Sequence, residues 1–259
     1  MKTPTIFVSH GAPTLLLDKT PTNNFLKNLG KSIDKPSAIL CISAHWETSQ
    51  PMVTISENLK TIYDFYGFPD ELYEVQYPAP GNPVLAEKVV AMLKDAGFHI
   101  SGDPSRGLDH GTWVPLKLMY PNADVPVVQL SVQTHLGAEH HFKMGRALSS
   151  LRDEGVLILG SGGATHNLRE FGLYSQDAQP VDYAKQFDIW LTKNIFEANT
   201  KPLLNYLEEG PHARRNHPTQ EHFLPLFVPL GAAGNSVKGR LLHSAIEYGI
   251  LSMAAFAWE

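Results

Sequence analysis

Three of the twelve histidines of this chain stand where short apolar segments end. His10, His45 and His166 each follow a different segment that is rich in aliphatic and β-branched residues, the pattern of a buried strand. In open α/β sheets, ligands bind beyond the carboxyl ends of the strands, so these imidazoles are expected at one edge of a sheet. Imidazole is a common metal ligand, and several converging imidazoles suit zinc, iron, copper or nickel. For any one of these residues alone, a hydrogen-bonded histidine at a strand end is the alternative.

Two further histidines lie at predicted helix starts. His110 follows Asp109, which can cap a helix, although His110 can also serve as an acid–base group because imidazole exchanges protons near neutral pH. His222 follows the possible cap Thr219, in the first turn of a predicted helix. The short zinc spacings, such as His-Glu-x-x-His or a cysteine pair, are missing from the sequence. A metal site therefore depends on convergence in space.

The other histidines are assigned structural or surface roles. His140 and His141 are expected on a polar helix face, and His135, which follows a predicted strand, could line a pocket. Four have no motif around them: His99, His212, His217 and His243.

The elements that must position these side chains can be predicted from the apolar pattern. Strands are predicted at 5–9, 38–43, 52–56, 125–132, 156–160, 241–246 and 251–257. Helices are predicted at 83–96, 112–119, 137–152, 181–197 and 219–230. This alternation predicts one α/β domain over residues 1–259, with a central mixed, largely parallel sheet and helices on both faces. The metal site is expected at the carboxyl edge of the strands.

Composition excludes several classes of protein. The chain is 43% hydrophobic and 18% charged, as in ordinary globular domains, and its net charge is −5 with scattered lysines and arginines. We therefore expect neither a nucleic-acid surface nor a membrane patch. No apolar stretch approaches the roughly 20 residues of a membrane span. The single cysteine, Cys41, excludes an intrachain disulfide and suits a reducing compartment, so a cytoplasmic location is expected.

Five motifs in matching order resemble the class III extradiol ring-cleavage dioxygenases, and within them the LigB-like DOPA dioxygenase branch. They are Ser9-His10-Gly11-Ala12-Pro13, Ser43-Ala44-His45-Trp46, Asp109-His110-Gly111-Thr112-Trp113, Thr165-His166-Asn167-Leu168 and Glu221-His222-Phe223-Leu224-Pro225-Leu226. The segments 62–69 and 77–81 resemble the same branch. The resemblance extends from about residue 5 to residue 256, nearly the whole chain.

The resemblance implies extradiol cleavage of a catechol with O₂ at a mononuclear metal, with DOPA and 4,5-cleavage expected. It implies that His10, His45 and His222 bind the metal, that His166 is a fourth ligand or the catalytic base, and that His110 contacts substrate or O₂ and carries protons. Fe(II) is expected for activity, and Zn(II) is plausible as the bound metal although it has no redox chemistry. The partners are then a small catechol and O₂, with the chain a monomer or small homo-oligomer.

One feature departs from the common pattern of non-haem iron sites, which is two histidines and a carboxylate. The third ligand here corresponds to His222, with Glu221 beside it. An all-histidine set keeps two alternatives open. A zinc hydrolase would need a carboxylate base, for which Glu47, Asp64 and Glu221 are candidates. A non-catalytic protein, similar to Memo-type signalling proteins, would bind a metal or a partner without turnover.

A long segment without predicted secondary structure, residues 59–81, carries a group of aromatic side chains. Tyr63, Phe65, Tyr66 and Phe68 could wall a flat substrate, or they could pack as a surface loop.

Overall fold

A computed structural model describes residues 2–234 and 236–259 of the chain. Its main sheet has eight strands in the order β4-β3-β5-β2-β6-β1-β10-β7. They are β1 (Thr5–Ser9), β2 (Ala38–Glu47), β3 (Met52–Thr54), β4 (Ser101–Asp103), β5 (Val127–Val132), β6 (Val156–Gly162), β7 (Arg240–His243) and β10 (Ala255–Trp258). A separate hairpin is formed by β8 (Ile246–Glu247) and β9 (Leu251–Ser252).

The four central strands β5, β2, β6 and β1 are parallel, β10 pairs antiparallel with β1, and β7 pairs antiparallel with β10. Every residue of β1, β5 and β6 is buried, as expected for parallel strands covered on both faces. The predicted mixed, largely parallel sheet is confirmed. Because β1, β2 and β6 run in the same direction, their carboxyl ends meet at one edge.

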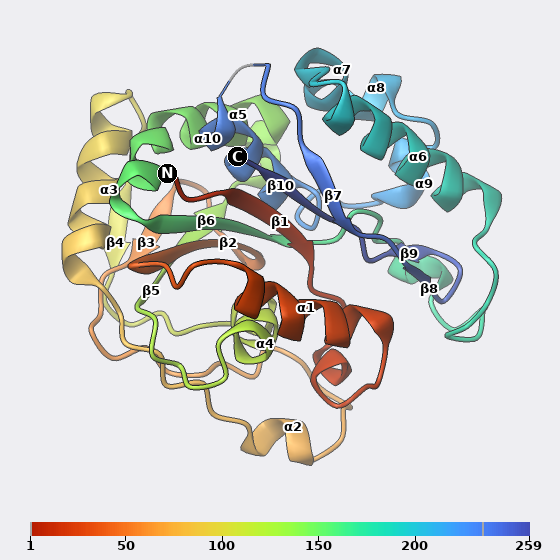
Figure 1. The fold of residues 1–259 in the computed structure, drawn as a ribbon, viewed down its shortest axis with the longest axis horizontal. Coiled ribbons are helices and arrows are strands. Elements are labelled where there is room, and N and C mark those ends of the chain that lie inside the picture. Colours follow the sequence, from red (N-terminus) through yellow and green to blue (C-terminus); the bar gives the residue numbers. More distant parts are fainter. Residues whose placement is uncertain (1, 235) are drawn as a thin grey trace.

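Helices cover both faces of this sheet (Figure 1), as predicted. One face carries α1 (Pro21–Ser32) and α4 (His110–Met119), and the other carries α3 (Pro83–Asp95), α5 (Gly137–Ala147) and α10 (Phe227–Ala233). Beyond β7 lie α6 (Asp182–Phe196), α7 (Thr200–Leu204), α8 (Tyr206–Glu209) and α9 (Ala213–Asn216), and the short α2 (Glu71–Glu74) lies in the long loop. Within the described ranges, no helix combines the length and apolarity that crossing a bilayer requires.

Four of the predicted elements differ from those in the structure. The strand predicted at 241–246 is divided into β7 and β8, and the helix predicted at 137–152 ends at Ala147 and is followed by a 3-10 helix at Ser149–Glu154. The helix predicted at 219–230 begins only with a 3-10 turn at Leu224–Leu226, followed by α10, so His222 lies in the turns before it. Pro225 stands in the first turn of this element, where its missing N–H is tolerated, and the residues before it do not extend the helix. The strand predicted at 251–257 is divided into β9 and β10.

Helix α1 was not predicted, although its start carries two recognisable signals. Thr20 caps it by accepting a hydrogen bond from the backbone N–H of Asn23, and Pro21 takes the first helical position. The polar sequence of the helix conceals its apolar side, on which Leu26 and Leu29 are buried.

His141 corrects one sequence prediction, because it is completely buried rather than on a polar helix face. Its Nδ1 lies 2.7 Å from the carbonyl oxygen of Gly137, to which it donates, and its Nε2 accepts from the backbone N–H of Gln133 at 3.1 Å. Protonation would remove that acceptor, and burial lowers the pKa of His141 to about 3. His141 therefore stabilises the fold in its neutral form.

This burial predicts a pH dependence of stability. The folded pKa of His141 lies below the unfolded value of about 6.5, so between these values the unfolded state binds the extra proton. We expect the contribution of His141 to the free energy of unfolding to fall by about 1.4 kcal/mol per pH unit as the pH drops below about 6.5. Urea unfolding of wild type and His141→Gln at pH 7, 6 and 5 measures it, and the variant should show the smaller slope. Equal slopes would contradict the prediction.

Candidate metal centre

Three histidines from distant parts of the chain come together beyond the carboxyl ends of the central strands. His10 follows β1 directly, His45 lies near the carboxyl end of β2, and His222 comes from the turns before α10. The Nε2 of His45 lies 3.0 Å from that of His10 and 3.2 Å from that of His222. The edge predicted from the sequence is therefore where these rings meet.

The hydrogen-bond partners of these rings determine which nitrogen carries the proton. Ser161 donates its hydroxyl hydrogen to the carbonyl oxygen of Gly111, so it must accept from His10 Nδ1, 3.0 Å away. The Nδ1 of His222 lies 3.0 Å from Glu221 Oε1, and the Nδ1 of His45 faces Asp64 Oδ2 at 3.6 Å. A carboxylate can only accept, so it favours a proton on Nδ1.

With a proton on each Nδ1, three Nε2 lone pairs point at one another without a proton among them. Such an arrangement is repulsive unless a cation lies between the nitrogens, and histidine ligands of metals are commonly held by just such Nδ1 contacts. His10, His45 and His222 therefore fit one divalent metal. Glu221 contacts Nδ1 of His222, on the side of the ring away from Nε2. Its carboxylate is not one of the ligand atoms that lie together with those of His10 and His45.

The electrostatics of the rings agree with neutral ligands. Burial, strengthened by the neighbouring histidines, lowers the pKa of His10 and of His222 well below the usual value. Burial and the proximity of His110 lower the pKa of His45 to about 3, against the opposite influence of Asp64. Neutral imidazoles can bind a cation at neutral pH without first losing a proton.

His110 stands beside this group, as the first residue of α4. Its ring centre is 3.8 Å from that of His45, and its Nδ1 lies 3.0 Å from Asp64 Oδ2. Burial would raise the pKa of Asp64, but the contacts with His110 hold it below the usual value. Asp64 also accepts from the backbone N–H of His110 at 2.9 Å. The loop aspartate thus orients a histidine that is not in the three-histidine group.

A buried network under the start of α4 fixes His110 in place. Asp109 is inaccessible to solvent and caps the helix through the backbone N–H of Thr112, as predicted. It also accepts from Ser43 Oγ at 2.6 Å and from Arg106 at 3.1 Å. Arg106 in turn donates to the carbonyl oxygen of His45 at 3.1 Å. Because one carboxylate connects β2 to α4, the two histidines are held in register.

His166 follows β6 but takes a different position from the three-histidine group. Its ring stacks on His222, with the centres 3.4 Å apart and the planes only 9° from parallel. Its ligand atom groups with those of His222 and Glu221, not with those of His10 and His45. Burial and the nearby His45 and His110 lower its pKa to about 3. His166 is therefore a neutral ring at the margin of the cluster.

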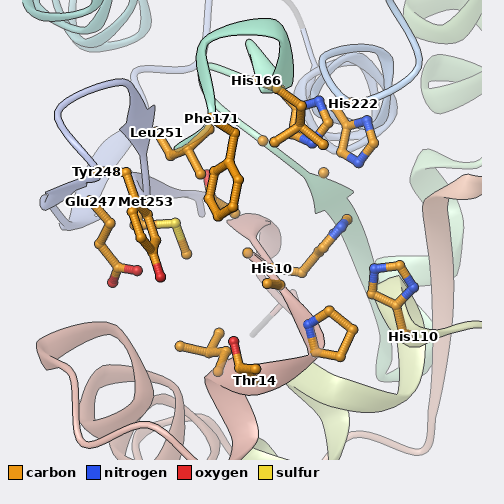
Figure 2. A pocket seen from close by; sticks show the side chains of 18 of the residues that line it. His10, Thr14, His110, His166, Phe171, His222, Glu247, Tyr248, Leu251 and Met253 are labelled. Carbon is orange, nitrogen blue, oxygen red and sulfur yellow. The ribbon is translucent and has the colours of Figure 1, made fainter. Parts of the chain in front are cut away.

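All five histidines line one cavity of about 440 Å³. Figure 2 shows His10, His110, His166 and His222 around it. Phe65, Tyr66 and Phe68 also line it, so three of the four loop aromatics face the cavity. Tyr63 instead packs against the core, and its hydroxyl donates to the carbonyl oxygen of Val75. A pocket this size can enclose a flat ring of substrate dimensions.

The other histidines lie elsewhere. His135 is exposed and does not line the cavity, although the sequence left that role open. His217 is buried and contacts the carbonyl oxygen of Ala164, although no motif in the sequence marked it.

No motif in the sequence marks Ser161 as a site residue, and none indicates that Glu221 and Asp64 orient imidazole rings. A weak signal existed for Ser161, because a hydroxyl between two glycines at the end of a buried strand has little packing purpose. For the carboxylates the sequence offered only a role as hydrolytic bases. Glu47, the third such candidate, is exposed and does not line the cavity.

Gly111 is expected to be intolerant of a side chain. A Cβ at this position would lie 2.5 Å from Ser43 Oγ, 2.9 Å from His45 and 3.1 Å from His10. We expect Gly111→Ala to cost about 1–3 kcal/mol of stability, as overpacking does, and to weaken metal binding by displacing the rings. Thermal unfolding and metal content after dialysis measure the two effects. Wild-type values for both would contradict this prediction.

Comparison with known proteins agrees with the fold. The family described as the catalytic LigB subunit of aromatic ring-opening dioxygenase matches residues 4–257. A 4,5-DOPA dioxygenase extradiol of Beta vulgaris is 46% identical over 97% of this chain and 95% of its own length. The Escherichia coli K12 protein of the same name is 39% identical over 96% and 92%. The crystal structure of an uncharacterized E. coli K12 protein superimposes with a TM-score of 0.82, at 37% identity and 99% coverage of both chains.

The chain belongs to the LigB family of aromatic ring-opening dioxygenases. The resemblance inferred from five short motifs is thereby confirmed over nearly the full length. Of the three hypotheses that the sequence left open, the family supports the extradiol dioxygenase over the zinc hydrolase and the non-catalytic protein.

Proposed function

We propose that this chain opens the ring of DOPA, or of a closely similar catechol, by extradiol 4,5-cleavage with O₂. The observation that carries the proposal is the convergence of the Nε2 atoms of His10, His45 and His222 in an aromatic-walled cavity. The relatives named 4,5-DOPA dioxygenase extradiol support the choice of substrate.

In this proposal His10, His45 and His222 hold one divalent metal, Fe(II) in the active enzyme and Zn(II) as an inactive occupant. When bound, iron supplies Lewis-acid polarisation of the catechol hydroxyls and the electron transfer to O₂ that zinc cannot supply. Three protein ligands leave the cavity side of the site free for small molecules. Ser161, Glu221 and Asp64 keep the three rings in the required tautomer.

The remaining histidines take proton-transfer roles. His166, a neutral ring at the cavity wall, accepts the proton of a substrate hydroxyl. His110 contacts substrate or O₂ from the other side, and Asp64 stabilises its ring when it carries a proton. Phe65 and Phe68 pack against the flat substrate ring and exclude water.

The proposal keeps the other expectations of the sequence analysis. The ligands are a small catechol and O₂, and the chain acts as one catalytic domain over residues 1–259, as a monomer or small homo-oligomer. A cytoplasmic location is supported by the lone cysteine, Cys41, which is fully buried.

Metal replacement tests the proposed function. The protein is stripped of metal, reloaded anaerobically with Fe(II) or Zn(II), and mixed with DOPA and O₂. We expect O₂ uptake and the visible absorbance of a ring-opened semialdehyde with iron, and neither with zinc. No uptake with either metal across several catechols would overturn the proposal.

A further inference from the structure

The wall of the cavity opposite the histidines is formed largely by the hairpin of β8 and β9. Figure 2 shows Glu247 and Tyr248 on the side of the cavity away from His110 and His222. Asp18, from the segment before α1, lines the same cavity. A catechol whose hydroxyls face the histidines would direct its ring substituent toward this wall. The chemistry of the wall therefore selects the substituent.

The charges on this wall have one sign. Asp18 and Glu247 are carboxylates, and among the described residues no lysine or arginine lines the cavity. A carboxylate substituent without any cation would be repelled and poorly solvated there, whereas an ammonium would find two opposite charges. The cavity is thus matched to a cation at one end and to a metal-bound catechol at the other.

Among the described residues, one carboxylate oxygen of Glu247, Oε2, accepts no hydrogen bond. Its Oε1 accepts from the hydroxyl of Thr22 at 2.9 Å, and within residues 2–234 and 236–259 no basic side chain forms an ion pair with it. His243 reaches Thr22 Oγ1 at 3.1 Å and contacts the carboxylate only through that hydroxyl. Burial raises the pKa of Glu247, and the neighbouring Asp18 adds to the effect. A bound cation would offset both the desolvation of the Glu247 carboxylate and its repulsion by Asp18.

The hairpin holds Glu247 firmly. Tyr248 and Gly249, at the tip, have positive φ angles of 53° and 65°, and the backbone N–H of Ile250 closes the turn by donating to the carbonyl oxygen of Glu247 at 3.2 Å. Positive φ is costly for tyrosine, so this conformation persists because the surroundings support it. The ring of Tyr248 packs on Phe171 with centres 4.8 Å apart, and both line the cavity. The Glu247 carboxylate therefore projects from a hairpin that packs against Phe171 through Tyr248.

We propose that Glu247, assisted by Asp18, binds the ammonium group of the substrate, so that the enzyme selects catechols bearing a cationic amine. This inference deepens the proposed function and rests on it. It makes Glu247 a specificity-determining residue that takes no part in ring opening. It also predicts that the carboxylate of DOPA contributes little, because the described lining offers it no cation.

The first experiment compares substrates with the iron-loaded wild-type enzyme. kcat/KM is measured for DOPA, dopamine, 4-methylcatechol and 3-(3,4-dihydroxyphenyl)propionate. We expect DOPA and dopamine to exceed the propionate by about 10- to 100-fold, the range of a charge-assisted hydrogen bond. Dopamine cleaved no better than the propionate would overturn the inference.

The second experiment changes the carboxylate. Glu247→Gln should lose about 10- to 100-fold in kcat/KM for dopamine, mostly through KM, and little for neutral 4-methylcatechol. Glu87→Gln is the matched control, because it removes the same charge from the exposed side of α3, which does not line the cavity. Equal losses for both substrates in Glu247→Gln would indicate a structural role and contradict the inference.

A binding measurement separates this inference from the proposed function. Tyramine and 3-(4-hydroxyphenyl)propionate lack the second hydroxyl and need no turnover, so calorimetry on zinc-loaded protein reports recognition alone. Tighter binding of tyramine to wild type than to Glu247→Gln supports the ammonium site even if no catechol is opened. If catechols are opened but tyramine binds no better than the propionate, the proposed function stands and the ammonium site is rejected.

Discussion

Replacing His222 by alanine is expected to abolish metal retention and, with it, ring opening. The change removes one of the three Nε2 atoms that lie within 4.8 Å of one another. Loss of an outer contact to a ligand already costs about 10–100-fold in metal affinity, so loss of the ligand itself should cost more than about 100-fold. Metal content after dialysis and O₂ uptake with DOPA measure the two losses together.

His99→Ala is the matched control for this substitution, because His99 is exposed and lies after α3, outside the cavity. It should retain wild-type metal content and turnover. Glu221→Gln should be intermediate, since it weakens the contact to His222 Nδ1 without removing Nε2. Full metal content in His222→Ala would show that this ring is not a ligand.

His166→Ala is expected to lower kcat by about 10²–10⁴-fold while the metal stays bound, the usual contribution of a general base. The physical reason is the position of the ring, which stacks on His222 instead of joining the Nε2 atoms of His10 and His45. Removing it takes away a proton acceptor and leaves the three-histidine group complete. Single-turnover kinetics and metal analysis of the same samples separate the two roles.

His110→Ala should show a kcat loss of the same order, because Asp64 orients its ring toward the same cavity. Parallel loss of metal and activity in His166→Ala would identify His166 as a fourth ligand instead. Near-wild-type turnover in both variants would refute both proton-transfer assignments.

Much of this protein follows from local sequence pattern. The central strands were predicted because parallel strands, buried on both faces, are continuous apolar runs in the sequence. Since such strands end at a common edge, the sequence alone places His10, His45 and His166 there. The motifs around them were enough to indicate the family, which the full-length comparison confirms.

Only the tertiary structure separated the histidines that can bind a metal together from those that lie beside them. His222 meets His45 across 177 residues of sequence, and the turns that carry it had been predicted as helix. Ser161 and Glu221 determine ring tautomers through contacts that no periodicity encodes.

The same holds for Glu247, which lines the cavity only because the C-terminal hairpin folds onto its side away from His110 and His222. Apolar spacing is a local property of the chain, so the sequence by itself determined the strands, the family and the edge where the site would form. Hydrogen-bond partners and burial depend on segments that are distant in sequence. Packing alone therefore determined the orientation of the rings, the neutral state of the buried His141, and the negative charge of the cavity wall that carries Asp18 and Glu247.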